Sequence, residues 1–282
     1  MNRHPWLALL FLLLFCAARY AYAAATGQSI WVPMQEPGLV GKRTVQLEAT
    51  VYKPDGAGPF PIVIFNHGSS GGPIPATYTE KAAAFGTYLV SKGIVLIVPM
   101  RRGRGQSEGI NREEPSACNV ESARQGIHYA SEAVAAVYDY LRRQPWASMN
   151  NIVLAGHSRG GMLASMYAAN HPGSAVGVIN FSGGWKSDNC GGEDLNAILF
   201  SEAGAGAKVP NLFLYAHGDG FYSDESVRKY AEAFEHAGGN VRFMLYAVDQ
   251  IDGHLLFHRA MRTWESEVDR FLTGLVLVIK TP

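Results

Sequence analysis

Three short stretches of the sequence share the pattern Gly-x-Ser-x-Gly: GSSGG at 68–72, GQSEG at 105–109 and GHSRG at 156–160. This pattern can place a serine on a sharp turn, with its hydroxyl exposed for nucleophilic attack on an acyl carbon. The turn needs a strand immediately before it and a helix immediately after it, because the helix N-terminus then lies beneath the reacting carbon. The flanking residues therefore decide which of the three serines can act as a nucleophile.

Only the third stretch has both flanks. The apolar run NIVLA leads into Ser158, and RGGMLASMYAAN follows it. Ser107 comes between the polar residues RRGR and a loop-like segment, so we interpret it as a turn residue. The stretch 68–72 follows an apolar run, but the prolines of PIP prevent an immediate helix. Its backbone N–H groups suit an oxyanion hole instead. We predict Ser158 as the nucleophile, the alternative being an ordinary helix N-cap serine.

A nucleophilic serine needs a general base, most often a histidine. Of the nine histidines, only His254 and His258 follow the last predicted strand. His254 lies in the loop DQIDGHLLFH, from which an imidazole can reach over the serine. We expect His258 to be part of the following helix. His254 is therefore the predicted base.

The base in turn needs a carboxylate that orients it. Asp219 lies just past the end of an apolar run and has a glycine on each side. Asp224 is explained as an ordinary residue at a helix start. Asp249 and Asp252 precede the histidine in its own loop and fit turn positions. We predict Asp219 as the acid and keep the other three aspartates as alternatives.

Apolar runs alternate with helical stretches along most of the chain. Continuous apolar runs are typical of strands buried on both faces of a parallel sheet. The predicted strands are 60–67, 94–100, 151–157, 176–182, 211–217 and 241–248, with an edge or antiparallel strand at 45–54. The predicted helices are 78–93, 121–145, 159–172, 224–239 and 258–272. This alternation predicts an α/β fold, a mostly parallel twisted sheet with helices on both faces.

The first residues read as a targeting segment. A short positive start, MNRHP, precedes the uncharged run WLALLFLLLFCAA and the small residues AYAAA at 21–25. We predict a signal peptide over residues 1–25, cleaved after Ala23, Ala24 or Ala25. An uncleaved anchor is the alternative, but the apolar run is short for a membrane span of roughly 20 residues. The sequence thus predicts an exported protein, periplasmic or secreted, with no membrane span after cleavage.

Composition excludes several other classes. The chain has 282 residues, 24 basic and 24 acidic, which is enough for one large domain. No basic run or basic-aromatic interleaving points to nucleic acid. His254 and His258 have helical ligand spacing but lack a third ligand nearby, so we expect no metal. We also expect no organic cofactor. The sequence is silent on the oligomeric state.

The motifs together resemble a known family. FNHGSSGG, RRGRGQSEG, GHSRGG, HGDGFY and DGHLLF, in this order, are similar to motifs of the α/β-hydrolase superfamily, most of all the dienelactone hydrolase-like serine esterases. The resemblance covers roughly residues 45–272. It implies Ser158 as nucleophile, Asp219 as acid and His254 as base, with an oxyanion hole formed by the backbone N–H groups of Ser69 and Arg159. Dienelactone hydrolases themselves use a cysteine nucleophile. The serine here favours plain ester or peptide-type acyl transfer.

The sequence also indicates the extent of the domain, a lid segment and candidate pocket residues. We predict one α/β-hydrolase domain over residues 26–282, with a short lid segment around 183–209 that leaves the site open. Trp185 is a candidate wall of the substrate pocket, the alternative being a core or surface aromatic. His67 of the oxyanion loop is a second candidate pocket residue. Arg102 in RRGRGQSEG is interpreted as scaffolding.

Two cysteines, Cys118 and Cys190, remain after the predicted cleavage. In an exported protein they suggest one disulfide, the alternative being two buried free thiols. Both follow the C-terminal ends of predicted parallel strands. Those ends share one rim of the sheet, the rim on which α/β active sites lie. A bridge there would brace the rim.

These observations predict an exported serine hydrolase that cleaves carboxylic esters of small molecules through an acyl-enzyme on Ser158. A peptidase of the same fold is one alternative. A non-catalytic binding protein on the hydrolase scaffold is the other.

Overall fold

The computed structural model describes residues 25–38, 40–69, 74–114, 117–186, 190 and 193–275. Residues 1–24 of the predicted signal peptide lie outside the described residues, as does the tail from residue 276 onward. Within the described ranges, no helix is long and apolar enough to cross a membrane.

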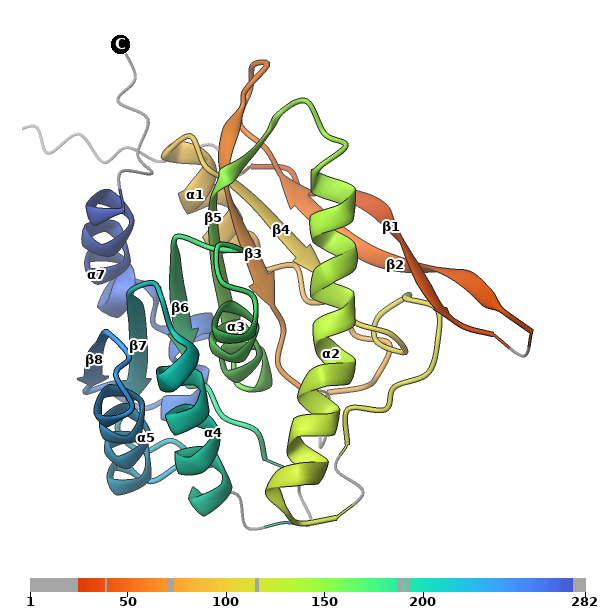
Figure 1. The fold of residues 1–282 in the computed structure, drawn as a ribbon. Helices are drawn as coiled ribbons and strands as arrows, with labels where there is room; N and C mark the ends of the chain where they lie inside the picture. The colour runs from red at the N-terminus through yellow and green to blue at the C-terminus, as the bar shows by residue number, and fades with distance from the viewer. Residues whose placement is uncertain are drawn as a thin grey trace, which may run out of the picture.

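One eight-stranded sheet runs through the molecule (Figure 1), in the order β1-β2-β4-β3-β5-β6-β7-β8. Strand β2 is antiparallel to both β1 and β4, and the remaining neighbours are parallel. The strands are β1 (Gln28–Pro37), β2 (Lys42–Tyr52), β3 (Phe60–Asn66), β4 (Val95–Pro99), β5 (Ala147–His157), β6 (Gly177–Phe181), β7 (Asn211–Ala216) and β8 (Val241–Tyr246).

Helices cover both faces of this sheet (Figure 1). The helices are α1 (Ala83–Ser91), α2 (Val120–Leu141), α3 (Arg159–Asn170), α4 (Glu193–Gly206), α5 (Asp224–His236), α6 (Leu256–Arg259) and α7 (Met261–Gly274), with a 3-10 turn η1 (Gly253–Leu255) before α6. Helices α1 and α7 share one core with Val63 and Phe65, while α2, α3, α4 and α5 share the other with Ile62 and Ile64. Successive strand residues point to opposite faces, and both faces are covered, so β3 is apolar up to its last residue, Asn66. The predicted α/β-hydrolase fold is confirmed.

Some element boundaries differ from prediction. The edge strand β1 was not predicted, and it forms a long antiparallel pair with β2. The first predicted helix, 78–93, begins only at Ala83, because Ala82 adopts a left-handed backbone with φ 47°. The predicted helix 258–272 is interrupted at Ala260, which separates α6 from α7. None of these differences moves the candidate catalytic loops.

The segment around 183–209, predicted as a short lid, contains helix α4. The Phe200 ring of this helix packs 5.1 Å from Phe213 of β7 and 5.5 Å from Tyr230 of α5. Phe200 therefore joins α4 to the core on this face of the sheet. Residues 187–189 and 191–192 of the predicted lid lie outside the described residues.

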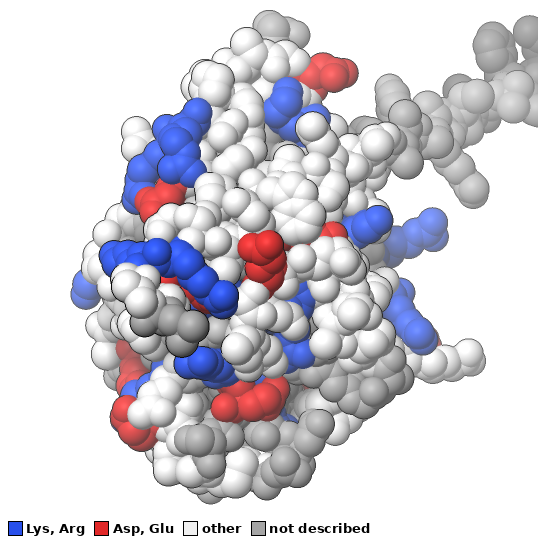
Figure 2. Space-filling model, turned by 90° about the vertical axis from the view of Figure 1, so that its right-hand side faces the viewer, with Lys and Arg blue, Asp and Glu red and all other residues white. Residues whose placement is uncertain are grey.

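Figure 2 shows the face of the molecule that lies on the right of Figure 1. Basic and acidic side chains lie among one another on this face, separated by uncharged residues. A polyanion approaching it would meet charges of both signs.

Candidate active site

Ser158 lies on a strained turn between a strand and a helix. Strand β5 ends at His157 and helix α3 begins at Arg159. The backbone of Ser158 has φ 56° and ψ −125°, a conformation that side-chain-bearing residues rarely adopt. A Cβ on Gly160 would lie 1.9 Å from the carbonyl oxygen of Asn66, so only glycine lets α3 start this close to β3. The strand–turn–helix expected around Ser158 is thus present.

The other two serine stretches have different surroundings. Ser107 is buried, and its Oγ donates to the Met100 carbonyl at 2.7 Å and accepts from the Glu48 N–H at 2.9 Å. It serves as a turn residue. The first stretch is described only at Gly68 and Ser69, while 70–72 lie outside the described residues. A Cβ on Gly68 would lie 3.3 Å from the Cβ of Ser158, so this loop lies directly beside the turn.

The structure brings His254 and Asp219 together. The Nδ1 atom of His254 lies 3.0 Å from Oδ2 of Asp219, and both side chains are more than nine-tenths buried. The other carboxylate oxygen, Oδ1, accepts from the backbone N–H groups of Phe221 at 2.8 Å and Tyr222 at 3.1 Å. The Phe221 ring covers the imidazole, with 4.3 Å between ring centroids. The carboxylate is therefore held in one orientation toward the imidazole.

Two further side chains hold the backbone of His254. Asp252 Oδ1 accepts from the His254 N–H at 2.8 Å and from the Gly220 N–H at 3.0 Å, which ties the histidine loop to the loop after β7. The Nε2 atom of His157, the residue before Ser158, lies 2.8 Å from the His254 carbonyl oxygen. Because a carbonyl only accepts, Nε2 carries the proton. Burial, followed by the nearby His254 and His258, lowers the pKa of His157 well below its usual value, so the ring is neutral.

The alternative acid and base residues have other partners. Asp224 lies in the first turn of α5, and its Oδ2 lies 2.5 Å from Nδ1 of His217, an exposed pair. His258 lies in α6, as predicted, with its Nε2 3.8 Å from Glu80. Among the candidate acids that the structure describes, Asp219 contacts the ring of His254 and Asp252 contacts only its backbone.

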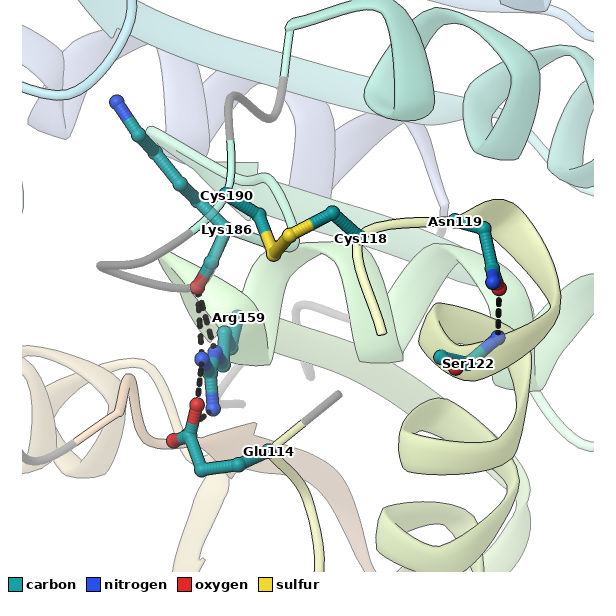
Figure 3. Close-up of a disulfide and its surroundings, with 7 residues drawn as sticks. All are labelled: Glu114, Cys118, Asn119, Ser122, Arg159, Lys186 and Cys190. Atoms are coloured by element: carbon teal, nitrogen blue, oxygen red, sulfur yellow. Dashed lines mark hydrogen bonds and ion pairs between the residues drawn. A yellow bond between two sulfur atoms is a disulfide. The ribbon is translucent and has the colours of Figure 1, made fainter. Parts of the chain in front are cut away.

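Arg159 is clamped beside the disulfide (Figure 3). Its guanidinium donates to both carboxylate oxygens of Glu114 at 2.6 and 2.7 Å, and Nη2 also donates to the Lys186 carbonyl at 2.7 Å. Cys118 and Cys190 are joined by a disulfide with 5.3 Å between their Cα atoms. Each cysteine follows one of the clamping residues by four positions. The bridge therefore ties together the two segments that hold Arg159 at the start of α3, where its own backbone N–H has no intrahelical acceptor.

The two candidate pocket residues are both buried. Trp185 is 1% exposed, lies in the core, and has the Arg159 guanidinium 5.3 Å above its ring. This placement favours the core alternative for Trp185. His67 is 4% exposed, and both of its ring nitrogens have partners within the protein. Neither side chain offers a free surface to a substrate in this structure.

A cavity of about 440 Å³ lies between the start of α1 and the helices α6 and α7. Its walls include Phe85, Phe257, Trp264 and the imidazole of His258. Neither Ser158 nor His254 is part of its lining. The His258 ring packs against the ring of His157, the residue before Ser158, with 4.8 Å between centroids.

Sequence reasoning missed a buried ionic group next to the loop that holds His67 and Gly68. The guanidinium of Arg101 pairs with the carboxylate of Glu113 at 2.6 Å, and both side chains are almost completely buried. Burial alone would raise the pKa of Glu113, but the adjacent Arg101 outweighs it and lowers the pKa to about 2. The only signal in the sequence was the arginine-rich segment RRGRG directly after a buried strand.

We expect stability to fall in acid because of these buried groups. Burial, and then the nearby Arg101, lowers the pKa of His67 to about 3 from the ordinary 6.5. His67 of the unfolded chain therefore binds a proton near pH 6.5, whereas His67 of the folded chain stays neutral until the pH nears 3. The stability that this difference contributes is fully present above pH 6.5 and is lost as pH falls toward 3. Glu113 adds a further loss of stability as pH falls from its ordinary pKa of 4.5 toward its folded-state pKa of about 2.

Urea unfolding at a series of pH values measures this effect. The free energy of unfolding is expected to fall by a few kcal/mol between pH 7 and pH 4. In His67→Phe the slope between pH 6.5 and 4 should be shallower. An unfolding free energy that stays constant down to pH 4 would contradict a neutral, buried His67.

The chain is similar to a family of peptidases and to several solved hydrolase structures. The family model for the X-Pro dipeptidyl-peptidase (S15 family) matches residues 41–190. No curated protein sequence matches the chain. Among solved structures, an esterase from Thermogutta terrifontis with butyrate bound is similar, with TM-score 0.56 and 17% identity over 93% of this chain and 98% of that one. A putative dienelactone hydrolase from Klebsiella pneumoniae has TM-score 0.58 and 16% identity over 88% and 99%.

A peptidase is also among the similar structures. Porphyromonas gingivalis dipeptidyl peptidase 4 has TM-score 0.61 and 16% identity over 92% of this chain, which spans only 36% of that protein. These identities show a shared fold. The α/β-hydrolase fold implied by the sequence resemblance is thereby confirmed. Because the family match spans 150 of the 282 residues, the chain belongs to the X-Pro dipeptidyl-peptidase (S15) family.

Proposed function

We propose that this protein is an exported serine hydrolase that cleaves carboxylic esters of small molecules through an acyl-enzyme on Ser158. The observation that carries the proposal is the oriented pair of His254 and Asp219, with 3.0 Å between Nδ1 and Oδ2. Both residues lie on loops at the rim of the sheet that also carries Ser158, which occupies a strained turn between a strand and a helix. An imidazole with Nδ1–H donated to a carboxylate has Nε2 free to accept a proton.

In this mechanism His254 takes the proton of Ser158 as the Oγ attacks the acyl carbon. The backbone N–H groups of Ser69 and Arg159 stabilise the oxyanion. His254 then gives its proton to the leaving alcohol, and the acyl-enzyme forms. A water molecule, activated by the same imidazole, releases the acid and regenerates the serine. No step uses a metal or an organic cofactor.

A peptidase is the second candidate, because the family model is that of a dipeptidyl peptidase. Esters are favoured because the chain is similar to an esterase along 98% of the length of that esterase. Helix α4, which stands where a lid was predicted, packs on the sheet. The test compares p-nitrophenyl acetate and butyrate with an X-Pro p-nitroanilide, together with fluorophosphonate labelling. Cleavage of the anilide alone would establish the peptidase, and no labelling of folded protein would favour the binding protein.

Export is part of the proposal and has its own test. The N-terminal pattern and the disulfide between Cys118 and Cys190 support it, because disulfides persist in oxidising compartments. Mass spectrometry of the protein from an expressing culture should show cleavage after Ala23, Ala24 or Ala25 and no alkylatable thiol. A full-length protein in which Cys16, Cys118 and Cys190 are all alkylatable would contradict export.

A further inference from the structure

The buried pair of Arg101 and Glu113 has no part in the mechanism above. Arg101 follows strand β4, and its side chain is 2% exposed, while that of Glu113 is 0% exposed. Nε and Nη2 of the guanidinium donate to Oε1 and Oε2 of the carboxylate at 2.6 and 3.0 Å. Removing two charges from water is costly, and replacing such a pair by apolar side chains is often neutral for stability. The other hydrogen bonds of the guanidinium therefore bear on its role.

The remaining donors of Arg101 reach the oxyanion loop. Nη1 donates to the carbonyl of His67 at 2.7 Å, and Nη2 donates to the carbonyl of Gly68 at 3.3 Å. The backbone N–H of Arg101 donates to Nε2 of His67 at 3.1 Å. Because Nε2 accepts, the proton of a neutral His67 lies on Nδ1, which then donates to the Gly68 carbonyl at 2.6 Å. Two successive carbonyls are therefore held from one side.

Fixing a backbone carbonyl also fixes the direction of the N–H group of the following residue, because both belong to one planar peptide. In a trans peptide the C=O of one residue and the N–H of the next point in opposite directions. The one cis peptide bond of the described residues joins Gly58 and Pro59, so the peptide between Gly68 and Ser69 is trans. With the Gly68 carbonyl directed at Arg101 and the His67 ring, the Ser69 N–H points away from them. Gly68 itself lies against the Cβ of Ser158.

We propose that Arg101, together with neutral His67, is a positioning residue that aims the Ser69 N–H at the oxyanion formed on Ser158. The inference rests on the proposed serine hydrolase function and extends it. Arg101 contacts neither substrate nor reacting atoms. Glu113 holds the guanidinium plane in the orientation that serves both carbonyls.

The test compares two neighbouring arginines. Arg101→Lys keeps a positive charge for Glu113, but a single ammonium cannot reproduce the planar fork that serves two carbonyls and a carboxylate. Arg102→Lys is the matched control. Arg102 is equally buried, and its Nη2 donates to the Tyr129 carbonyl at 2.7 Å and to Glu132 at 2.6 Å. No contact of the oxyanion loop is changed in that control.

With p-nitrophenyl butyrate, kcat of Arg101→Lys is expected to fall by about 100-fold, the effect of losing one oxyanion donor. The KM should change by less than about threefold, because ground-state binding is preserved. Affinity for a trifluoromethyl ketone, which forms an oxyanion on the serine, should fall in parallel with kcat. Arg102→Lys should stay within about threefold of the wild type on all three measures.

A purely structural role for Arg101 would give a different pattern. Equal losses in Arg101→Lys and Arg102→Lys, or a wild-type kcat in a folded Arg101→Lys, would overturn the inference while leaving the proposed function intact. Wild-type protein that neither hydrolyses the ester nor takes up fluorophosphonate would overturn both. If Arg101→Lys does not fold, His67→Phe provides the test, because it removes both ring hydrogen bonds without leaving a buried charge. It should lower kcat by about tenfold or more, and an unchanged kcat would overturn the inference.

Discussion

Replacing Ser158 by alanine is expected to abolish fluorophosphonate labelling and to lower kcat for p-nitrophenyl butyrate by about 10⁴- to 10⁶-fold. The reason is that the acyl-enzyme route requires the Oγ, whereas the oxyanion donors and the bound substrate geometry leave only a small residual rate. The backbone at this position already has a positive φ with serine, so alanine introduces no further strain. Folding should be unaffected, as judged by thermal unfolding.

Ser107→Ala is the matched control for this change. Ser107 belongs to the same sequence pattern, but its hydroxyl forms hydrogen bonds with the Met100 carbonyl and the Glu48 N–H. The control should be labelled at the wild-type rate, although losing a buried hydrogen bond costs about 1 kcal/mol of stability. Labelling that persists in Ser158→Ala would show that another serine is the nucleophile. Labelling lost in both variants would point to a folding defect rather than to catalysis.

Replacing Asp219 by asparagine is expected to lower kcat by about 10³- to 10⁴-fold, the effect of the same change in a serine-protease triad. The hydrogen bonds of this site explain why. The Oδ1 atom accepts from Phe221 and Tyr222, so the asparagine must keep its carbonyl oxygen there. Its NH₂ group then faces Nδ1 of His254. The imidazole must accept at Nδ1, which moves its proton to Nε2, where it can no longer receive the proton of Ser158.

Asp224→Asn separates this effect from a general change of charge. Asp224 contacts His217 at the start of α5 and is about half exposed. The control should retain kcat within about twofold, as surface changes away from the site usually do. A measurement of kcat against pH for each variant completes the comparison. A severe loss in Asp224→Asn alone would show that the acid had been assigned to the wrong aspartate.

The candidate triad could be predicted because each member is marked by its own short stretch of chain. A strand before Ser158 and a helix after it are visible as apolar runs, and the glycines around it mark a close approach. Asp219 was separable from Asp224 because only the latter has a local explanation at a helix start. The structure brings the ring of His254 to Asp219, while Asp224 pairs with His217.

Burial decides the role of several residues that the local pattern left open. Trp185 and His67 were predicted as candidate pocket residues, and both are buried. Helix α4 lies in the segment predicted as a short lid, and its Phe200 packs in the core. The edge strand β1 was overlooked because six of its ten residues are exposed and its apolar pattern is weak.

The sequence by itself determined most of the succession of strands and helices, the strained turn at Ser158 and the loops that carry Asp219 and His254. These features depend on interactions between residues close in the chain, which leave periodic and compositional signals. Tertiary structure alone decided the sheet order, the exposure of each loop residue and the contacts of Arg101 with Glu113 and with the carbonyls of His67 and Gly68. Such contacts join residues 12 to 34 positions apart. They form because packing the helices on the sheet brings those side chains into one buried space, where every polar group must find a partner.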